Sequence, residues 1–162
     1  MSQFLDKSKP ARKSRWSWYL YDFGNSAYAS VVLLAVYSTY FKNAVVGGAE
    51  GTRLWGISVG VAAILVAILS PIFGTIADFT KGKKKFLFIF TALAIIFTAL
   101  LFFVREGDVF IGMLFFIMAE IGYRAAQVFY DALLMDVSTP ETIGFVSGKG
   151  WAVGMIGGII IL

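Results

Sequence analysis

Residues 109–137 read VFIGMLFFIMAEIGYRAAQVFYDALLMDV, an apolar stretch that carries polar side chains at regular intervals. It is long enough to cross a lipid bilayer as a helix, since about 20 mostly apolar residues suffice. Its polar members are Glu120, Arg124, Gln127 and Asp131. At about 100° per residue, their spacing places all four on one face, within roughly 60°. A single polar stripe on an apolar helix predicts that this face lines a bundle interior or a water-filled cavity.

The rest of the chain is also strongly apolar. Its 162 residues are 59% hydrophobic and 15% charged, whereas soluble domains are about 45–50% apolar and about 25% charged. A chain of this size buries only about 70% of its surface by folding, so the excess requires lipid. Complete spans are expected at residues 16–41, 54–77, 86–104 and 109–137, and a fifth begins near Ser147 and stops while still apolar. We therefore predict an all-α membrane protein with four complete transmembrane helices and a truncated fifth.

The basic residues predict the orientation of these helices, because cytoplasmic loops of membrane proteins are enriched in Lys and Arg. Segment 1–15 is a polar tail with five basic residues, and the connection 78–85 holds four lysines. The connections 42–53 and 105–108 hold only Lys42, Arg53 and Arg105. We expect a multi-pass protein with a cytoplasmic N-terminus, in the cell (inner) membrane or, in a eukaryote, the vacuolar membrane.

The composition argues against several function classes. The chain has no His and no Cys, which removes common metal ligands and the commonest general base. No zinc-protease, nucleophile-elbow or phosphate-loop motif occurs, so we expect no enzyme activity, no metal and no cofactor. The net charge of +4 comes from short clusters between apolar runs, which indicates membrane topology rather than nucleic-acid binding. A channel is disfavoured because the chain has no filter-like loop.

The first expected helix carries a weaker polar face, formed by Asp22, Asn25 and Ser26. The first and fourth helices run in opposite directions, so this face and the polar stripe of the fourth helix should lie at similar depth. An unpaired buried charge is far more costly than a paired one. We therefore hypothesise an ion pair between Asp22 and Arg124, with Glu120 as a second partner one turn away.

Two interpretations of these polar residues stay open. Buried ion pairs can simply fix how helices pack, or the residues can form a solute or proton pathway through the membrane. The second interpretation is favoured because one ion pair does not need four polar groups. In that case Glu120 and Asp131 are candidate proton carriers. Arg124 stays charged, so it anchors an anionic group or tunes a neighbouring acid.

Small residues recur at a spacing typical of helix packing in lipid, where close backbone approach replaces the hydrophobic effect between helices. Gly56 and Gly60 form one such pair in the second expected helix. Gly150, Gly154 and Gly158 form a longer series in the fifth. We expect both series to lie at helix–helix contacts.

Three segments resemble a known transporter family. The segment GTIADFTKGKKK resembles the signature loop of the major facilitator superfamily, and its matching residues are Gly74, Asp78, Gly82, Lys83 and Lys84. The sequence RAAQ from Arg124 to Gln127 is similar to the RxxQG motif of that superfamily. The stretches WYLYDFGNSAYASVV and VFYDALLMDVSTPETIGFVSGKGWAVGMIGG are similar to its vacuolar amino-acid effluxer-like branch.

This resemblance implies a twelve-helix fold in two pseudosymmetric halves, whose first and fourth helices line a central cavity. Residues 16–162 would then form most of the N-terminal six-helix bundle, and the missing C-terminal half would be a partner. The signature loop would act as a gate between the halves. The implied function is a secondary active transporter that moves a small polar solute by alternating access, with amino acids and protons as candidate cargo. The alternative is a truncated, non-transporting membrane module that assembles with other chains or is inactive.

Overall fold

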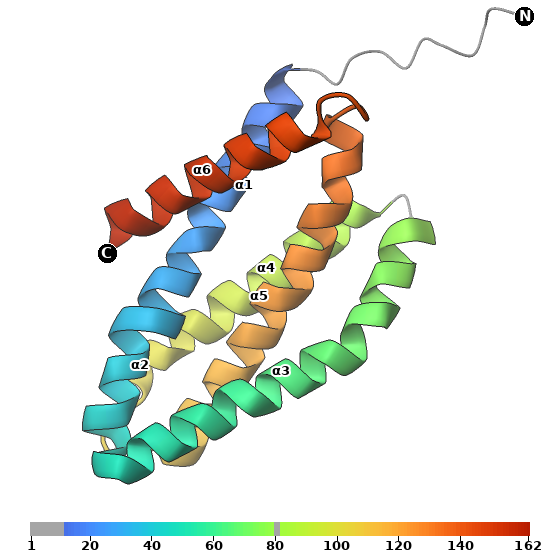
Figure 1. The fold of residues 1–162 in the computed structure, drawn as a ribbon. Coiled ribbons are helices and arrows are strands. Elements are labelled where there is room, and N and C mark those ends of the chain that lie inside the picture. Colours follow the sequence, from blue (N-terminus) through green and yellow to red (C-terminus); the bar gives the residue numbers. More distant parts are fainter. Residues whose placement is uncertain (1–11, 80–81) are drawn as a thin grey trace, which may run out of the picture.

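The structure is a computed structural model that describes residues 12–79 and 82–162 (Figure 1). Within these ranges the regular structure is helical and contains no strand. Among the described residues, five helical segments are long and apolar enough to cross a membrane: Lys13–Val46, Gly48–Ile76, Lys83–Phe103, Val109–Val137 and Ile143–Ile161. The prediction of an all-α membrane protein is confirmed, and the fifth helix is also long enough to span.

The first span differs from its expected bounds. It runs without a break through α1 (Arg12–Tyr28), the π-helical turns η1 (Ala29–Ala35), α2 (Val36–Tyr40) and the π-helical turns η2 (Phe41–Val46). The last residues of the expected polar tail therefore belong to α1, and residues 1–11 lie outside the described part. The expected loop 42–53 is also wrong. It shrinks to a sharp turn because Gly47 and Gly48 adopt positive φ angles of 86° and 61°, which glycine tolerates without steric cost.

The other helices follow the sequence more closely. They are α3 (Gly48–Phe79), α4 (Lys83–Leu100) with the short 3₁₀ turn η3 (Leu101–Phe103), α5 (Val109–Val137) and α6 (Ile143–Ile161). The bounds of α5 match the expected span. Helix α6 begins four residues before Ser147, because the Thr139 amide donates a hydrogen bond to the Thr142 hydroxyl at 3.0 Å and the Ile143 amide donates to the Thr139 carbonyl at 2.9 Å. These bonds form a turn that starts the helix.

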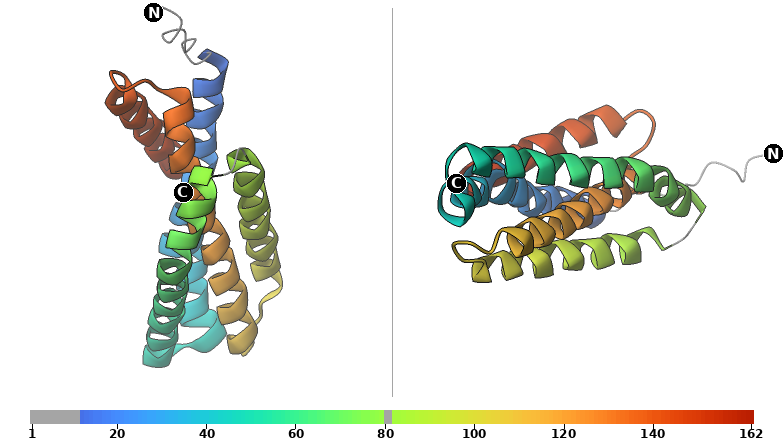
Figure 2. Two further views of the ribbon diagram at one scale, coloured as in Figure 1. Left: turned by 90° about the vertical axis from the view of Figure 1, so that its right-hand side faces the viewer. Right: turned by 90° about the horizontal axis from the view of Figure 1, so that it is seen from below.

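Helix α5 is the central element of the bundle. It packs against α4 and α3, while α6 packs mainly against α1 (Figures 1 and 2). The start of α1, the connection between α3 and α4 and the connection between α5 and α6 lie at one end (Figure 1). We call this end the N-terminal end of the bundle. The turn at Gly47 and the connection between α4 and α5 lie at the opposite end.

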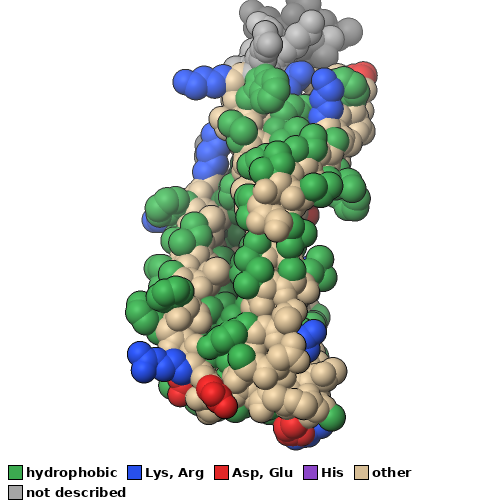
Figure 3. All heavy atoms as spheres, turned by 90° about the vertical axis from the view of Figure 1, so that its left-hand side faces the viewer, with side chains coloured by type: hydrophobic (Ala, Val, Ile, Leu, Met, Phe, Trp, Pro, Cys, Tyr) green, Lys and Arg blue, Asp and Glu red, His purple; other side chains and the backbone are tan. Residues whose placement is uncertain are grey.

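Two aromatic-rich clusters form the core. One lies towards the opposite end and joins Tyr37 and Phe41 to Phe116 of α5. The other lies towards the N-terminal end and joins Trp18 to Tyr130. Outside these clusters, many large apolar side chains are exposed, and on the face in Figure 3 they cover much of the surface between the charged ends. Such a belt is what a membrane-spanning bundle presents to lipid.

Candidate solute site between α1 and α5

Helices α1 and α5 run antiparallel, and hydrogen bonds between their two spans fix the register. Near the N-terminal end, Trp18 Nε1 donates to the Tyr130 carbonyl at 3.1 Å. Further along, Asn25 Nδ2 donates to Gln127 Oε1 at 2.7 Å. Near the opposite end, the Tyr37 hydroxyl donates to the Gly112 carbonyl at 3.1 Å. The polar stretches of the two helices therefore meet at the same level of the bundle, as the sequence predicted.

The Asn25–Gln127 hydrogen bond joins the two polar faces directly. Both amide side chains are only partly buried. Each supplies a hydrogen-bond partner that the other would otherwise have to find in water. Next to this pair, the rings of Tyr28 and Tyr123 stack with centroids 4.6 Å apart. The Arg124 guanidinium lies 5.5 Å from the centre of the Tyr123 ring, within the range of a cation–π contact.

The ionic pairing agrees with the expected one only for the second partner, Glu120. Arg124 Nε donates to Glu120 Oε1 at 2.8 Å within α5, and no ion pair of Asp22 occurs among the described residues. The expected pairing of Asp22 with Arg124 is therefore wrong. The reason is local geometry: residues four apart share a helix face, so Glu120 reaches the guanidinium without any interhelical constraint. The Glu120 side chain is 4% exposed and that of Arg124 is 49% exposed, which places a buried acid behind an accessible cation.

Asp22 instead faces α6. It is 8% exposed, and a Cβ atom built on Gly154 would lie 2.7 Å from its Oδ2 atom and 2.8 Å from the Ser26 hydroxyl. Only glycine leaves room for these two side chains at this crossing. Asp131 is exposed on α5. The α1–α5 contact therefore carries Asp22 on the side towards α6, and the Glu120–Arg124 pair lies further along the polar stripe.

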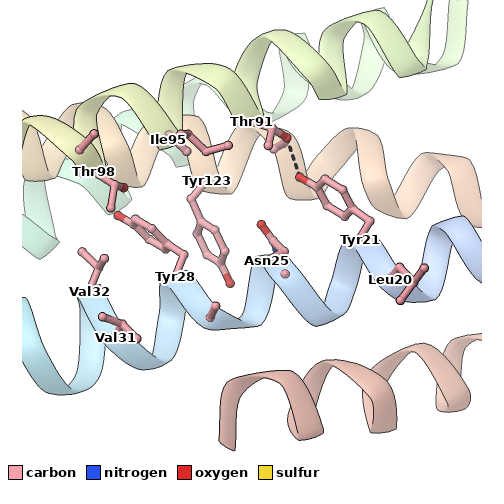
Figure 4. A pocket seen from close by; sticks show the side chains of 15 residues that line it. Leu20, Tyr21, Asn25, Tyr28, Val31, Val32, Thr91, Ile95, Thr98 and Tyr123 are labelled. Carbon is pink, nitrogen blue, oxygen red and sulfur yellow. Dashed lines mark hydrogen bonds between the residues drawn. The ribbon is translucent and has the colours of Figure 1, made fainter. Parts of the chain in front are cut away.

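A cavity of about 650 Å³ adjoins the site between α1, α4 and α5. Its walls are mostly apolar, and Asn25 is one of its few polar lining residues. Figure 4 shows the Tyr21 hydroxyl pointing across it to Thr91, and the two oxygens are 2.7 Å apart. Sequence reasoning missed Tyr21 and Tyr28. Their spacing around Asn25, four residues before and three after, puts all three on one face of α1 and was the available signal.

The two glycine series behave differently. A Cβ atom on Gly150, Gly154 or Gly158 would lie under 3 Å from Trp18, Asp22 or Ser30 of the first span, so these glycines lie at a close helix contact. A Cβ on Gly56 or Gly60 would meet nothing within 4 Å. We expected Gly56 and Gly60 to lie at a helix–helix contact, but no described residue packs against their side of α3.

The signature segment spans the connection between α3 and α4, and residues 80–81 of it lie outside the described part. Gly74 has open space around it, and Asp78 is exposed in the last turn of α3. Gly82 precedes α4, and its carbonyl accepts hydrogen bonds from the first turn. Among the residues of the signature segment, Lys83 forms an ion pair. Its Nζ contacts the Asp136 carboxylate at 3.3 Å.

Comparisons with known proteins identify the family of the chain. The family described as "Vacuole effluxer Atg22 like" matches residues 54–144, which include most of α3, all of α4 and all of α5. The chain belongs to this family. The matched part of this vacuole effluxer-like chain contains the complete polar stripe of α5. The family's description names an effluxer, which is a transport protein.

Two curated bacterial proteins are similar to this vacuole effluxer-like chain. The uncharacterized MFS-type transporter YxiO of Bacillus subtilis (strain 168) is 38% identical over 152 residues, which cover 91% of this chain and 36% of the relative. An uncharacterized protein of Aquifex aeolicus (strain VF5) is 30% identical over 146 residues, which cover 88% of this chain and 35% of the relative. The chain thus spans about a third of the length of these relatives. No solved structure matches it. The expected resemblance to major facilitator transporters is confirmed.

Proposed function

We propose that this chain supplies the N-terminal part of a secondary active transporter that moves a small polar solute by alternating access. The observation that carries the proposal is the meeting of α1 and α5. Their polar faces are joined by the Asn25–Gln127 hydrogen bond at the same level of an otherwise apolar bundle. Ionisable groups inside membrane spans are costly and are retained where they serve a pathway.

The charge arrangement favours amino acids as the solute class. The half-exposed Arg124 guanidinium is oriented by the buried Glu120, so it is available to bind a carboxylate through charge-assisted hydrogen bonds. Asp131 lies seven residues further along α5, about 10 Å along the helix axis, and can bind an ammonium group. The carboxylate of an amino acid would bind the guanidinium, with Gln127 and Asn25 as neutral contacts along the stripe towards Asp131.

Alternating access and coupling follow from the same residues. Glu120 and Asp131 are the carboxylates that would exchange protons with the solute pathway, since Arg124 stays charged at any physiological pH. We infer that the signature segment acts as the gate at the N-terminal end of the bundle, and that this end faces the cytoplasm. Its basic helix ends favour that orientation. The membrane is the cell (inner) membrane, or the vacuolar membrane in a eukaryote.

The test is uptake and efflux of labelled amino acids by the full-length transporter in proteoliposomes, with and without a pH gradient. We expect Glu120→Gln and Arg124→Gln each to reduce transport at least tenfold. The matched controls are Glu141→Gln, in the exposed connection before α6, and Arg53→Gln, on the exposed surface of α3. If the site variants and their controls transport equally well, the polar stripe is not the solute site.

The second candidate is a non-transporting module that assembles with other chains, and one observation favours it. Arg124 and Asp131 are exposed within a membrane span, which requires cover from other parts of the protein or from a partner. The 162-residue chain reconstituted alone separates the candidates. Activity confined to the full-length protein supports the transporter part, whereas inactivity of both forms, when both are folded, supports the module.

A further inference from the structure

Asp22 is a buried carboxylate to which the proposed solute pathway assigns no role. It lies on α1 where this helix packs against α6 (Figure 1), and it is 8% exposed. It makes no hydrogen bond or ion pair with any described residue. Helices of the described bundle already cover this side chain almost completely, so the rest of a full-length transporter can add little to its surroundings.

The basic residues of the neighbouring helices have other contacts. Arg124 of α5 donates to Glu120 at 2.8 Å. Lys149, the charged residue of α6, lies against an aromatic ring of its own helix, and Arg15 of α1 donates to a backbone carbonyl at the end of α5. A buried carboxylate without a partner is costly. Asp22 therefore requires a positive charge that the described side chains do not supply.

Oxygen atoms line the side of the first span that faces the glycines of α6. Asp22 Oδ2 and the Ser26 hydroxyl lie 2.7 Å and 2.8 Å from one point, the position that a Cβ atom on Gly154 would take. One turn further, the Ser30 hydroxyl lies 2.7 Å and the Ser26 carbonyl oxygen 3.6 Å from the corresponding position at Gly158. Four oxygen atoms therefore face the glycine backbone of α6 within about two turns of helix.

The two serine hydroxyls are available as ligands. A serine inside a helix can donate to the carbonyl four residues earlier, as Ser38 and Ser58 do at 2.9 Å. Ser26 and Ser30 make no hydrogen bond with any described residue. Ser30 also lies in η1, where the first span changes from α-helix to π-helix, a change that is frequent at functional sites. A carboxylate beside unbonded oxygen atoms is the ligand chemistry of a hard cation.

We propose that Asp22 and Ser26 bind one sodium ion at the α1–α6 contact. One carboxylate neutralises one positive charge, which favours Na⁺ over a divalent ion. Several converging oxygen atoms favour a metal cation over a proton, which needs only one acceptor. Gly154 leaves the space that the carboxylate occupies. The role of this ion as the coupling ion rests on the transport function proposed above, whereas its binding does not.

The test is equilibrium binding of radioactive Na⁺ to the purified full-length transporter in detergent at alkaline pH. Asp22→Asn should weaken binding about tenfold or more, because it removes the charge of the site. Ser26→Ala should weaken it about threefold, because it removes a single ligand. The matched controls are Asp136→Asn, a half-exposed acid at the end of α5, and Ser58→Ala, a serine bonded within α3. A wild type that binds no Na⁺, or equal weakening in variants and controls, would overturn the proposal.

A further variant tests the geometry of the site without removing an oxygen atom. A Cβ atom on Gly154 would displace the Asp22 carboxylate, so Gly154→Ala should weaken Na⁺ binding about fivefold. Gly148→Ala is the control, because Gly148 has open space where a side chain would begin. Circular dichroism checks that both variants are folded. Wild-type Na⁺ affinity in a folded Gly154→Ala variant would contradict the assignment.

Transport under a sodium gradient separates the ion site from the solute site. In proteoliposomes, an inward Na⁺ gradient should raise amino-acid uptake by the full-length wild type about fivefold or more, the lower end of typical coupling between two ligands. It should have no effect on Asp22→Asn. Na⁺ binding without any amino-acid uptake would support the ion site and reject the proposed solute. Uptake driven by a pH gradient, without Na⁺ binding, would assign a proton to Asp22 and reject the sodium site.

Discussion

Helices α5 and α3 are both long and apolar, yet their surroundings differ completely. In α5, 39% of the most apolar part of the span is buried within the described bundle, whereas in α3 the share is 6%. Each carries an acid and an arginine on one face, Glu120 with Arg124 and Glu50 with Arg53. The α5 pair has a buried acid, while both members of the α3 pair are more than half exposed. The two ion pairs have the same residue types but should therefore contribute differently to the free energy of unfolding.

The comparison teaches that apolarity alone does not distinguish a central membrane helix from a peripheral one. Lipid and protein are equally acceptable solvents for an apolar side chain. What marks α5 as central is its combination of polar stripe and small residues. Gly122 lets the backbone of α4 approach, and Glu120 and Gln127 find their partners within the protein.

The largest expected effect concerns close backbone packing. A Cβ atom on Gly122 would lie 2.7 Å from the Ala94 amide nitrogen and 2.9 Å from the Phe90 carbonyl oxygen. Gly122→Leu should therefore separate α4 from α5 and cost about 3 kcal/mol, because backbone atoms cannot move aside as a flexible side chain does. The measurement is the free energy of unfolding in mixed micelles. Gly60→Leu on α3 is the control, and equal destabilisation by both would remove the distinction between the two helices.

The next effect compares the two ion pairs. Arg124→Gln leaves the Glu120 carboxylate buried without its cation and should cost about 1–2 kcal/mol, a value reduced because the guanidinium is half exposed. Arg53→Gln removes an exposed partner and should leave stability unchanged. Both variants are measured by the same unfolding titration. Similar destabilisation in the two would mean that the α5 pair is solvated like the α3 pair.

A smaller effect is expected for the hydrogen bond that joins α1 to α5. A double-mutant cycle of Asn25→Ala and Gln127→Ala should give a coupling energy of about 0.6 kcal/mol, the average for interhelical hydrogen bonds in a membrane protein. The unfolding free energies of the wild type, both single variants and the double variant supply the coupling. Zero coupling would indicate that water or another group replaces each amide.

The smallest effect concerns the end of α5. Lys83 has a side chain 22% exposed and Asp136 one 52% exposed, so solvent screens their interaction. A cycle of Lys83→Gln and Asp136→Asn should give a coupling of about 0–1 kcal/mol that decreases as salt is added. A larger, salt-independent coupling would contradict this solvated pair and indicate a structural tie between α4 and α5.

The sequence predicted the number and type of the elements and much of their detail. The bounds of α5 were correct because Arg105–Asp108 is a short polar interruption with Gly107 at a positive φ. The turn at Gly47 was missed because polar residues around it suggested a long loop, although the chain stays helical up to Val46. The level at which α1 meets α5 was also predictable, since antiparallel spans of similar length bring their polar residues to similar depth.

By itself the sequence determined that the chain spans a membrane, because no water-soluble core can bury so apolar a composition. It also determined that Glu120, Arg124, Gln127 and Asp131 share a face, because helix periodicity is a local property. Only the tertiary structure decided that Asp22 turns towards α6 rather than towards Arg124, and that the glycines of α6 rather than Gly56 and Gly60 lie at a close contact. These outcomes depend on which helix lies beside which, and residues distant in sequence settle that through the space their side chains leave.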